Sequence, residues 1–369
     1  MCDFFKRAIT GVQALQPYQP GKPLEELERD YGIVDAVKLA SNENPLGPSP
    51  AVIDILGSSM QDISRYPDGN GFGLKQALVS KYSNINLEEI TLGNGSNDVL
   101  ELIARAFVSE TDEVIFSQYA FAVYPIVTQA IGAKAVITSA KSWGHDLDAM
   151  LSAITAKTKL IFIANPNNPT GTWLSETLLV KFLKSVPANV LVVLDEAYFE
   201  FASDAKYGAN GYPDGLALLK QFNNLIVTRT FSKAYGLAGL RVGYAIANKD
   251  ITNILNRVRQ PFNVNLLALK AAEAALSDQA YLQAGIELNA EQMKVIVDGL
   301  TSLKLEYIPS IGNFVSFKVN DAASCYENLL KHGIIVRPVG NYGMHNFLRV
   351  SIGTADENSR FLSALKNVI

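Results

Sequence analysis

From about residue 50 to residue 260, short apolar runs rich in β-branched residues alternate with stretches whose apolar residues recur at helical spacing. The apolar runs predict strands at Glu113–Ser117, Lys134–Thr138, Leu160–Ala164, Val190–Asp195, Leu225–Thr228 and Gly243–Ala247. Helices are predicted between most of these strands, for example at Asn97–Val108, Glu176–Ser185 and Ile251–Val258. Such alternation predicts an α/β fold, a mostly parallel sheet with helices on both faces.

The flanking regions follow different patterns. The first forty residues contain Pro17, Pro20 and Pro23 and are predicted to be an irregular arm rather than a domain. Residues 266–303 have a helical pattern, which predicts two helices or one bent helix. Further strands are predicted at Phe314–Val319, Ile334–Pro338 and Leu348–Ile352, and helices at Ala322–Lys331 and Glu357–Asn367. We therefore expect an N-terminal arm with part of a small domain at 1–45, a large domain at 46–262 and a small α+β domain at 263–369.

Composition and charge exclude several classes of protein. Of the 369 residues, 48% are hydrophobic and 18% are charged, which is typical of a globular protein with a large core. The net charge of −4, without a run of Lys and Arg, predicts no nucleic-acid partner. No apolar run is long enough for a membrane span and no signal-peptide pattern is visible, so we expect a cytoplasmic protein without a membrane partner. The two cysteines and three histidines lack ligand spacing and predict no metal site; surface or loop positions are expected for His145, His332 and His345.

The segment Thr230–Gly243 carries the most specific chemistry of the chain. It holds Lys233 among small and hydroxyl residues, with Arg241 eight positions later. A shielded lysine with little to pair with loses its proton easily and can attack an aldehyde. Ser232 and Arg241 can hold a phosphate nearby, because a planar guanidinium bonds two oxygens at once. This combination indicates a site for pyridoxal phosphate (PLP), whereas a lone Ser-Lys pair would indicate only a surface lysine.

Two of the predicted strands end in polar residues, where ligands of such sheets bind. Asn168 lies in the segment Asn165–Gly171 and can donate its amide to a ring hydroxyl, although the same segment also suits a tight turn. Asp195 closes the next strand, and a buried acid needs a partner such as a pyridinium nitrogen. Tyr198, three residues later, can bond the phenolic oxygen of the same ring. A magnesium-binding Asp-Glu pair is the competing interpretation, but the sequence has no G-x-x-x-x-G-K-[ST] loop.

Glycines precede another predicted helix. The segment Gly93–Asp98 opens the helix, and the backbone N–H groups at the helix N-terminus favour an anion there. A simple helix cap is the alternative interpretation of the same residues. The segment Gly69–Gly73 looks like a dinucleotide-binding loop but does not follow a strand, so no Rossmann-type site is predicted.

With these segments together, the chain resembles the fold-type I PLP-dependent aminotransferases and, within them, the histidinol-phosphate aminotransferase family. The resemblance runs nearly end to end and is most specific in the N-terminal segment. It rests on Lys38–Pro50, Arg65–Asp68, Gly93–Asn97, Asn165–Gly171, Asp195–Tyr198, Thr230–Gly243 and Phe347–Thr354. It implies a large domain with a seven-stranded, mostly parallel sheet, a smaller α+β domain, and PLP as cofactor. It also implies amino transfer between histidinol phosphate or imidazole-acetol phosphate and glutamate or 2-oxoglutarate, in histidine biosynthesis.

The resemblance further implies roles for individual residues. Lys233 bonds the cofactor covalently and moves the substrate proton, Asp195 pairs with the pyridine nitrogen, and Tyr198 and Asn168 hold the phenolate oxygen. The implied phosphate ligands are Ser96, Asn97, Thr230, Ser232, Arg241 and, from the neighbouring subunit of a homodimer with shared active sites, Tyr66.

An aromatic ring should also stack on the cofactor. Phe121 is the expected residue, because Phe121 and Tyr124 match the aromatic-x-x-Tyr pattern of the family. The chain departs from the commoner Pro-Thr-aromatic form and reads Ser117-Gln118-Tyr119-Ala120-Phe121, so Tyr119 is the rival.

Substrate contacts are implied as well. Arg349 should bind the α-carboxylate, and Arg337 either binds a second anion of the substrate or forms a surface salt bridge of little energy. Tyr18, in the arm, should cover the imidazole, and Asn44 is a further candidate for substrate binding.

Three other functions match parts of the pattern. The same scaffold can serve an aromatic amino acid aminotransferase or a decarboxylase of a phosphorylated amino acid. A PLP-binding sensor of a transcription regulator would carry a helix-turn-helix domain, for which there is no room before residue 38. A non-catalytic relic is disfavoured because Lys233, Asp195 and Arg349 are all present.

Overall fold

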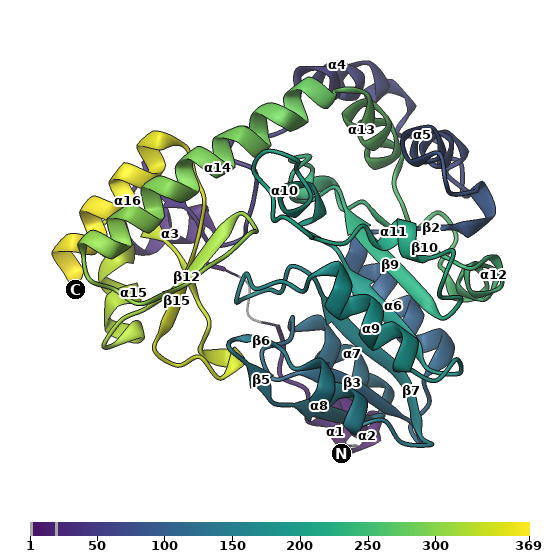
Figure 1. Ribbon diagram of the computed structural model, residues 1–369. Coiled ribbons are helices and arrows are strands. Elements are labelled where there is room, and N and C mark those ends of the chain that lie inside the picture. Colours follow the sequence, from purple (N-terminus) through teal and green to yellow (C-terminus); the bar gives the residue numbers. More distant parts are fainter. Residues whose placement is uncertain (1–2, 19–20) are drawn as a thin grey trace.

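The computed structural model describes residues 3–18 and 21–369, and its largest feature is a seven-stranded sheet (Figure 1). The strand order is β2-β10-β9-β8-β7-β3-β4. The strands are β2 Ile90–Gly93, β3 Glu113–Ser117, β4 Lys134–Thr138, β7 Thr158–Ala164, β8 Leu191–Asp195, β9 Leu225–Thr230 and β10 Gly243–Ala247. Neighbouring strands are parallel except at β10, which is antiparallel to both β2 and β9. The prediction of a mostly parallel sheet is confirmed.

Helices cover both faces of this sheet, as the alternating pattern predicted. Successive side chains of a strand point to opposite faces, so Ile115 packs into one core and Val114 and Phe116 pack into the other. One face is covered by α6 Ser96–Phe107, α7 Val123–Ile131 and α12 Lys249–Val258. The other face is covered by α5 Phe72–Tyr82, α8 Leu147–Ser152, α9 Glu176–Ser185, α11 Gly215–Leu218 and α13 Leu266–Ser277.

A second sheet lies beside the first (Figure 1). It has four antiparallel strands in the order β11-β12-β15-β14. They are β11 Tyr307–Ile308, β12 Phe314–Lys318, β14 Arg337–Pro338 and β15 Phe347–Ser351. A separate hydrophobic core joins this sheet to α14 Gln279–Ser302, α15 Ala322–Lys331 and α16 Ala355–Val368.

The predicted helical stretch at 266–303 forms two helices, α13 and α14. Asp278 separates them, because its backbone leaves the helical conformation and its side chain accepts a hydrogen bond from the backbone of Tyr281. α13 packs along α4 Pro50–Ser59, and α14 runs from there toward the four-stranded sheet (Figure 1). The residue ranges expected for the two domains stay a prediction.

The prediction of an irregular first forty residues is wrong in part. The structure has helices α1 Phe4–Arg7, α2 Thr10–Gln13 and α3 Leu24–Tyr31 there, and a short strand β1 Val37–Lys38 that pairs with β13 Ile334–Ile335. The physical reason is that a proline can start a helix as well as interrupt one. Pro23 is the N-cap residue of α3, Leu27 anchors the helix in the interior, and Gly32 ends it in the left-handed conformation.

The remaining elements are short. They are β5 Ala140–Lys141, β6 Gly144–His145, α10 Phe199–Ala202, and the 3-10 helices η1 Met60–Asp62, η2 Leu87–Glu89, η3 Ala238–Leu240 and η4 Gly340–Tyr342.

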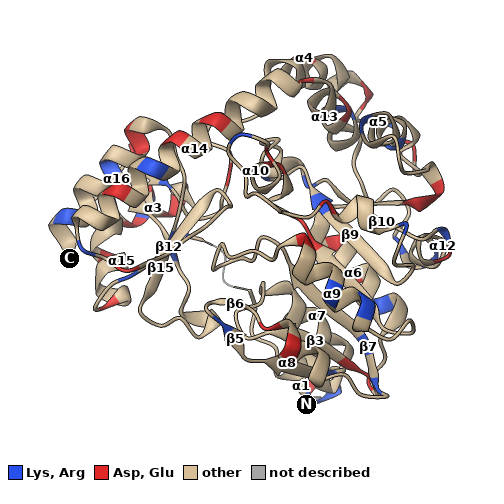
Figure 2. Cartoon of the chain, viewed as in Figure 1, with Lys and Arg blue, Asp and Glu red and all other residues tan. Residues whose placement is uncertain are grey.

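The surface has charges of both signs. Lys and Arg occur together with Asp and Glu on outer helices such as α14 and α16 (Figure 2). Within residues 3–18 and 21–369, no helix combines the length and hydropathy that crossing a membrane requires. The same residues contain no group of three or more His, Cys, Asp or Glu side chains placed to bind a metal ion.

Candidate active site

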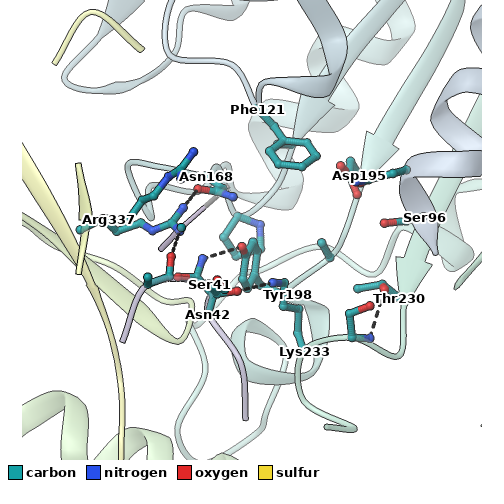
Figure 3. A pocket seen from close by; sticks show the side chains of 18 of the residues that line it. Ser41, Asn42, Ser96, Phe121, Asn168, Asp195, Tyr198, Thr230, Lys233 and Arg337 are labelled. Atoms are coloured by element: carbon teal, nitrogen blue, oxygen red, sulfur yellow. Dashed lines mark hydrogen bonds between the residues drawn. The ribbon is translucent and has the colours of Figure 1, made fainter. Parts of the chain in front are cut away.

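A cavity lies where the carboxyl ends of β7, β8 and β9 face the four-stranded sheet (Figure 3). Distant parts of the chain line it, from the N-terminal arm to β15. Nearly all of the residues predicted for the site come together here: Tyr18, Ser96, Asn97, Phe121, Asn168, Asp195, Tyr198, Thr230, Ser232, Lys233, Arg241, Arg337 and Arg349.

Lys233 follows β9 and points its amine into the cavity (Figure 3). The amine donates a hydrogen bond to the backbone carbonyl of Ser41, at 2.8 Å. Burial, reinforced by the positive charge of Arg349, lowers the pKa of Lys233 to about 7. A large fraction of this amine is therefore neutral at physiological pH and can act as a nucleophile or base.

Asp195 ends β8 as a buried acid on the cavity wall. Its carboxylate accepts hydrogen bonds from the hydroxyls of Tyr124, at 2.8 Å, and Thr228, at 3.0 Å. Burial nevertheless raises the pKa of Asp195 above its ordinary value, although both hydrogen bonds act in the opposite direction. A cationic ligand group placed against this carboxylate would stabilise its charged form.

Tyr198 lies three residues beyond Asp195, with its hydroxyl near the cavity centre (Figure 3). The amide of Asn42 donates to this hydroxyl at 2.8 Å. Burial raises the pKa of Tyr198 to about 12, so the phenol keeps its proton and can donate a hydrogen bond.

A group of donors suited to a phosphate lies at the other end of the cavity. Ser96 and Asn97 are the first residues of α6, so their backbone N–H groups lack partners in the helix. Thr230 and Ser232 add hydroxyls. Arg241 has a left-handed backbone (φ 58°) and donates to the hydroxyl of Ser232 at 3.1 Å. We call these five residues the phosphate cradle.

Two buried arginines lie side by side at the far wall. Arg337 on β14 and Arg349 on β15 are direct partners in the strand register. Arg349 donates to the side chain of Asn168 and to the backbone carbonyl of Ala40, and its Nε is buried without a partner among the described residues. The guanidinium of Arg337 lies 5.4 Å from the ring centre of Tyr18. Such a pair favours a ligand with more than one negative charge.

The two aromatic candidates for the cofactor ring are placed differently. Phe121 lines the cavity (Figure 3), whereas Tyr119 packs on Trp143 with ring centres 5.2 Å apart and is not part of the wall.

Two predicted site residues lie outside the cavity. Asn44, for which a substrate contact was expected, instead donates its amide to the backbone carbonyl of Ala234 at 2.9 Å, and so contacts the residue after Lys233. Tyr66 is 83% exposed and stacks on Phe262, with ring centres 4.7 Å apart.

The expectation for His145 is wrong, because its ring is buried and bonds the backbone carbonyl of Ala164 at 2.8 Å. Burial lowers its pKa, so the imidazole is neutral.

Several cavity residues were not predicted. Asn42, Ser41 and Tyr342 line the wall. Tyr124 and Thr228 do not line the cavity but donate hydrogen bonds to Asp195. Asn42 and Ser41 lie in the segment Lys38–Pro50, whose polar residues were the available signal. Tyr342 had no signal in the sequence, since only the fold brings η4 to this wall.

The fold and the site together match a known class of enzyme. Residues 34–365 match the family of aminotransferases class I and II, and the chain belongs to this family. Aspartate aminotransferase from Thermus thermophilus, at 22% identity and a TM-score of 0.83 over 98% of this chain and 99% of its own, shares the fold.

Closer relatives define a narrower group. The chain is 54% identical to histidinol-phosphate aminotransferase 2 of Pseudomonas aeruginosa, over 100% of this chain and 99% of the relative. It is 53% identical to histidinol-phosphate aminotransferase 1 of Nitrosococcus oceani, over 99% and 98%. The crystal structure of histidinol-phosphate aminotransferase from Sinorhizobium meliloti, in complex with pyridoxal-5'-phosphate, has a TM-score of 0.89 at 30% identity and covers 98% of this chain and 97% of its own. The chain is a member of the histidinol-phosphate aminotransferase family.

PLP is the cofactor of this family, and the residues of the cavity fit it. A buried acid, a lysine with a pKa of about 7 and a phosphate cradle face one cavity. Arg241 also approaches the backbone so closely that position 95 has no room for a side chain: a methyl group on Gly95 would lie 2.4 Å from its guanidinium. Each chemical part of PLP, the ring nitrogen, the aldehyde and the phosphate, thus has a complementary group.

Proposed function

We propose that this chain transfers the amino group between histidinol phosphate and glutamate, with imidazole-acetol phosphate and 2-oxoglutarate as the keto partners, in histidine biosynthesis. The observation that carries the proposal is the pairing of Arg337 and Arg349 in one cavity with Lys233. One donor has a phosphate and no carboxylate, and the other has two carboxylates, so a site for both needs two cationic groups. The full-length identity to histidinol-phosphate aminotransferases supports the same substrates.

The cofactor would be held by the residues whose chemistry fits it. Ser96, Asn97, Thr230, Ser232 and Arg241 would bind the phosphate, Phe121 would pack on the ring, and Tyr198 and Asn168 would bond the phenolic oxygen. Bound PLP supplies an electron sink, which needs a protonated ring nitrogen. Asp195 would keep that proton in place, because a buried carboxylate is stabilised by a cation next to it.

Lys233 would do the proton transfer. Its amine is neutral near pH 7, so it could take the proton from the substrate Cα and deliver it to C4′ of the cofactor. The hydrogen bond to the carbonyl of Ser41 would orient the free amine before it bonds the cofactor. Asn44 would act indirectly, since it holds the backbone next to Lys233.

The substrate would lie between the two sheets. Arg349 would bind the α-carboxylate of glutamate, and Arg337 would bind the phosphate of histidinol phosphate or the side-chain carboxylate of glutamate. Tyr18, whose ring lies against Arg337, would cover the imidazole. Substrate choice would then depend mainly on Arg337.

We also propose that the enzyme is a homodimer with shared active sites, in which Tyr66 binds the phosphate of the cofactor in the partner subunit. In support, the side chain of Tyr66 is exposed in the single subunit. Three apolar side chains on nearby segments are exposed as well, those of Phe262, Phe72 and Ile63. The division into a large domain at 46–262 and a small domain at 263–369, with 1–45 as an arm, is part of the same proposal. A cytoplasmic location stays a prediction from the sequence.

A donor panel tests the substrate. Histidinol phosphate, glutamate and phenylalanine should be compared as donors for the wild type and for Arg337→Ala. We expect histidinol phosphate to have the highest kcat/KM in the wild type. In Arg337→Ala its kcat/KM should fall by about 10- to 150-fold, the value of a charged hydrogen bond of about 1.5–3 kcal/mol. Phenylalanine lacks a second anion and should lose much less.

The exposed arginine Arg29 offers a matched control, because Arg29→Ala removes an arginine outside the cavity. Equal losses for histidinol phosphate and phenylalanine in Arg337→Ala would mean that Arg337 is structural. A wild type that prefers phenylalanine would contradict the proposed substrate.

A further inference from the structure

The segment that joins α12 to α13 contacts the loop that carries Tyr66. Phe262 stacks on Tyr66, and Arg259 donates through Nη1 to the backbone carbonyl of Gly69 at 3.0 Å. The packing is close, because a methyl group on Gly69 would lie 3.2 Å from the ring of Phe262. Phe262 has a left-handed backbone (φ 58°), which is costly for a bulky residue and is retained where the surroundings demand it.

The same segment also contacts the loop that begins the phosphate cradle. Asn263 donates through its amide to the carboxylate of Asp98 at 2.8 Å and to the backbone carbonyl of Leu92 at 3.1 Å. The same carboxylate oxygen of Asp98 accepts from the backbone N–H of Asn94 at 2.8 Å. Asp98 therefore holds the backbone just before Ser96, the first residue of the cradle.

A hydrogen bond connects these two sets of contacts. Arg259 donates through the same Nη1 to the side-chain oxygen of Asn263, at 2.8 Å. The result is a continuous chain of polar contacts from Gly69 through Arg259, Asn263 and Asp98 to Asn94. We call Arg259, Asn263 and Asp98 the relay. The side chains of these three residues are partly buried, and α12, which precedes Arg259, packs beside α6 and β2 (Figure 1).

We propose that the relay couples the two active sites of the dimer, through positioning residues that tie the phosphate cradle of one subunit to the Tyr66 loop that serves the other subunit. This inference rests on the proposed homodimer with shared active sites. A phosphate bound in the cradle restricts the backbone at Asn94. Through the hydrogen bonds of the relay, the backbone at Gly69 and the side chain of Tyr66 are restricted as well. Coupling between sites is reciprocal, so a filled site in either subunit strengthens cofactor binding in its partner.

Hybrid dimers can separate this role from a local one. Two differently tagged subunits are co-expressed and the hybrid is purified over both tags. The reader subunit is wild type, and its partner carries Lys233→Ala, so that only the reader forms a covalent bond with PLP. Titration of the apo-hybrid with PLP, followed by the absorbance of the lysine-bound cofactor, gives the affinity of the reader site alone.

The partner subunit then receives one further change at a time. With Asn263→Ala in the partner, we expect PLP to bind the reader site at least about threefold more weakly. Arg259→Met, which keeps the length of the side chain but breaks the contact with Gly69, should weaken it in the same direction. Asn224→Ala in the partner is the matched control: it also removes an amide-to-carbonyl contact, with Val190, but far from the relay, and should change nothing.

Tyr66→Phe in the partner tests the shared site by itself. If it weakens PLP binding at the reader site while Asn263→Ala and Arg259→Met do not, the shared site stands and the relay is refuted. The relay is also refuted if Asn263→Ala acts only when it is placed in the reader subunit. If Tyr66→Phe has no effect in the partner, the shared site itself fails, and the coupling fails with it. Formation of each hybrid shows that the variant subunit has folded.

Discussion

At the residue scale, the proposed chemistry depends on the charge of one lysine. Burial and Arg349 lower the pKa of Lys233 from its ordinary 10.5 to about 7. The lowered value means that the amine loses its proton as the pH rises through about 7. The rate of covalent PLP capture by the apo-enzyme should therefore rise with pH up to about one unit above that pKa and then level off. Stopped-flow absorbance measures this rate.

Lys233→Ala provides the control for that measurement and should capture no PLP. A capture rate that continues to rise tenfold per pH unit toward pH 10 would indicate an ordinary lysine and contradict the lowered pKa.

Asp195 supplies a second prediction at this scale. Asp195→Asn keeps the size of the side chain and can keep the contact with Thr228, so the fold should be retained in circular dichroism. The charge next to the ring nitrogen is lost, and kcat should fall by more than tenfold, or about 1.4 kcal/mol of transition-state stabilisation. A smaller loss in single-turnover measurements would show that Asp195 does not pair with the ring nitrogen.

Residues with local signals were the ones that sequence reasoning located. Asp195 ends a strongly apolar strand and Asn168 follows another, so their polar side chains stand out, and Lys233 stands out among small and hydroxyl residues. Tyr124 carries no such signal for its contact with Asp195, because it lies on a helix and reaches the carboxylate only through the packing of α7 on the sheet. Contacts of that kind depend on tertiary structure and cannot be read from spacing.

At the scale of elements, the phosphate cradle depends on how closely β10 approaches the start of α6. A methyl group on Gly243 would lie 2.4 Å from the backbone nitrogen of Ser96. We expect Gly243→Ala to displace the cradle and to weaken PLP binding by about 5- to 150-fold, the effect of about 1–3 kcal/mol of overpacking. An absorbance titration measures the affinity, and circular dichroism shows that the sheet remains.

Gly239→Ala is the control in the preceding loop, because a methyl group there has no neighbour within 4 Å. Wild-type affinity in Gly243→Ala would mean that the cradle tolerates a shift of β10.

Elements with a clear apolar pattern were predicted well, and elements without one were missed. The strands β3, β4 and β10 match their predicted ranges, as do α9 and α15. β2 was missed because its four residues, Ile90–Gly93, end in a glycine loop and show too little alternation. α3 was missed because charged residues fill most of its turns and Leu27 is its only buried residue.

At the scale of the whole molecule, the proposed dimer makes a prediction of its own. Tyr66→Phe should weaken PLP retention by at most about 1.5–3 kcal/mol, one hydrogen bond to a charged group. Lys233→Ala should be inactive. A hybrid of the two variants contains one site with an intact Lys233 and an intact Tyr66 from the partner, so mixing them at low PLP should restore part of the activity.

Activity assays on the mixture, with subunit exchange verified by mass spectrometry of native dimers, measure this recovery. No recovery in spite of complete exchange would argue that each subunit builds its site alone.

The pairing of β10 with β2 also determines when the candidate active site can form during synthesis of the chain. β2 is the first and β10 the last strand of the seven-stranded sheet along the chain, yet Gly93 and Gly243 are direct register partners. The loop before α6 and the loop of Lys233 and Arg241 therefore meet only after the ribosome has made β10. A nascent chain that ends before β9 lacks three of the five residues of the phosphate cradle, so the proposed phosphate contacts cannot form in it. Any folding of the large sheet that begins on such a chain would proceed without the cofactor, and pairing between strands so distant in sequence is slow.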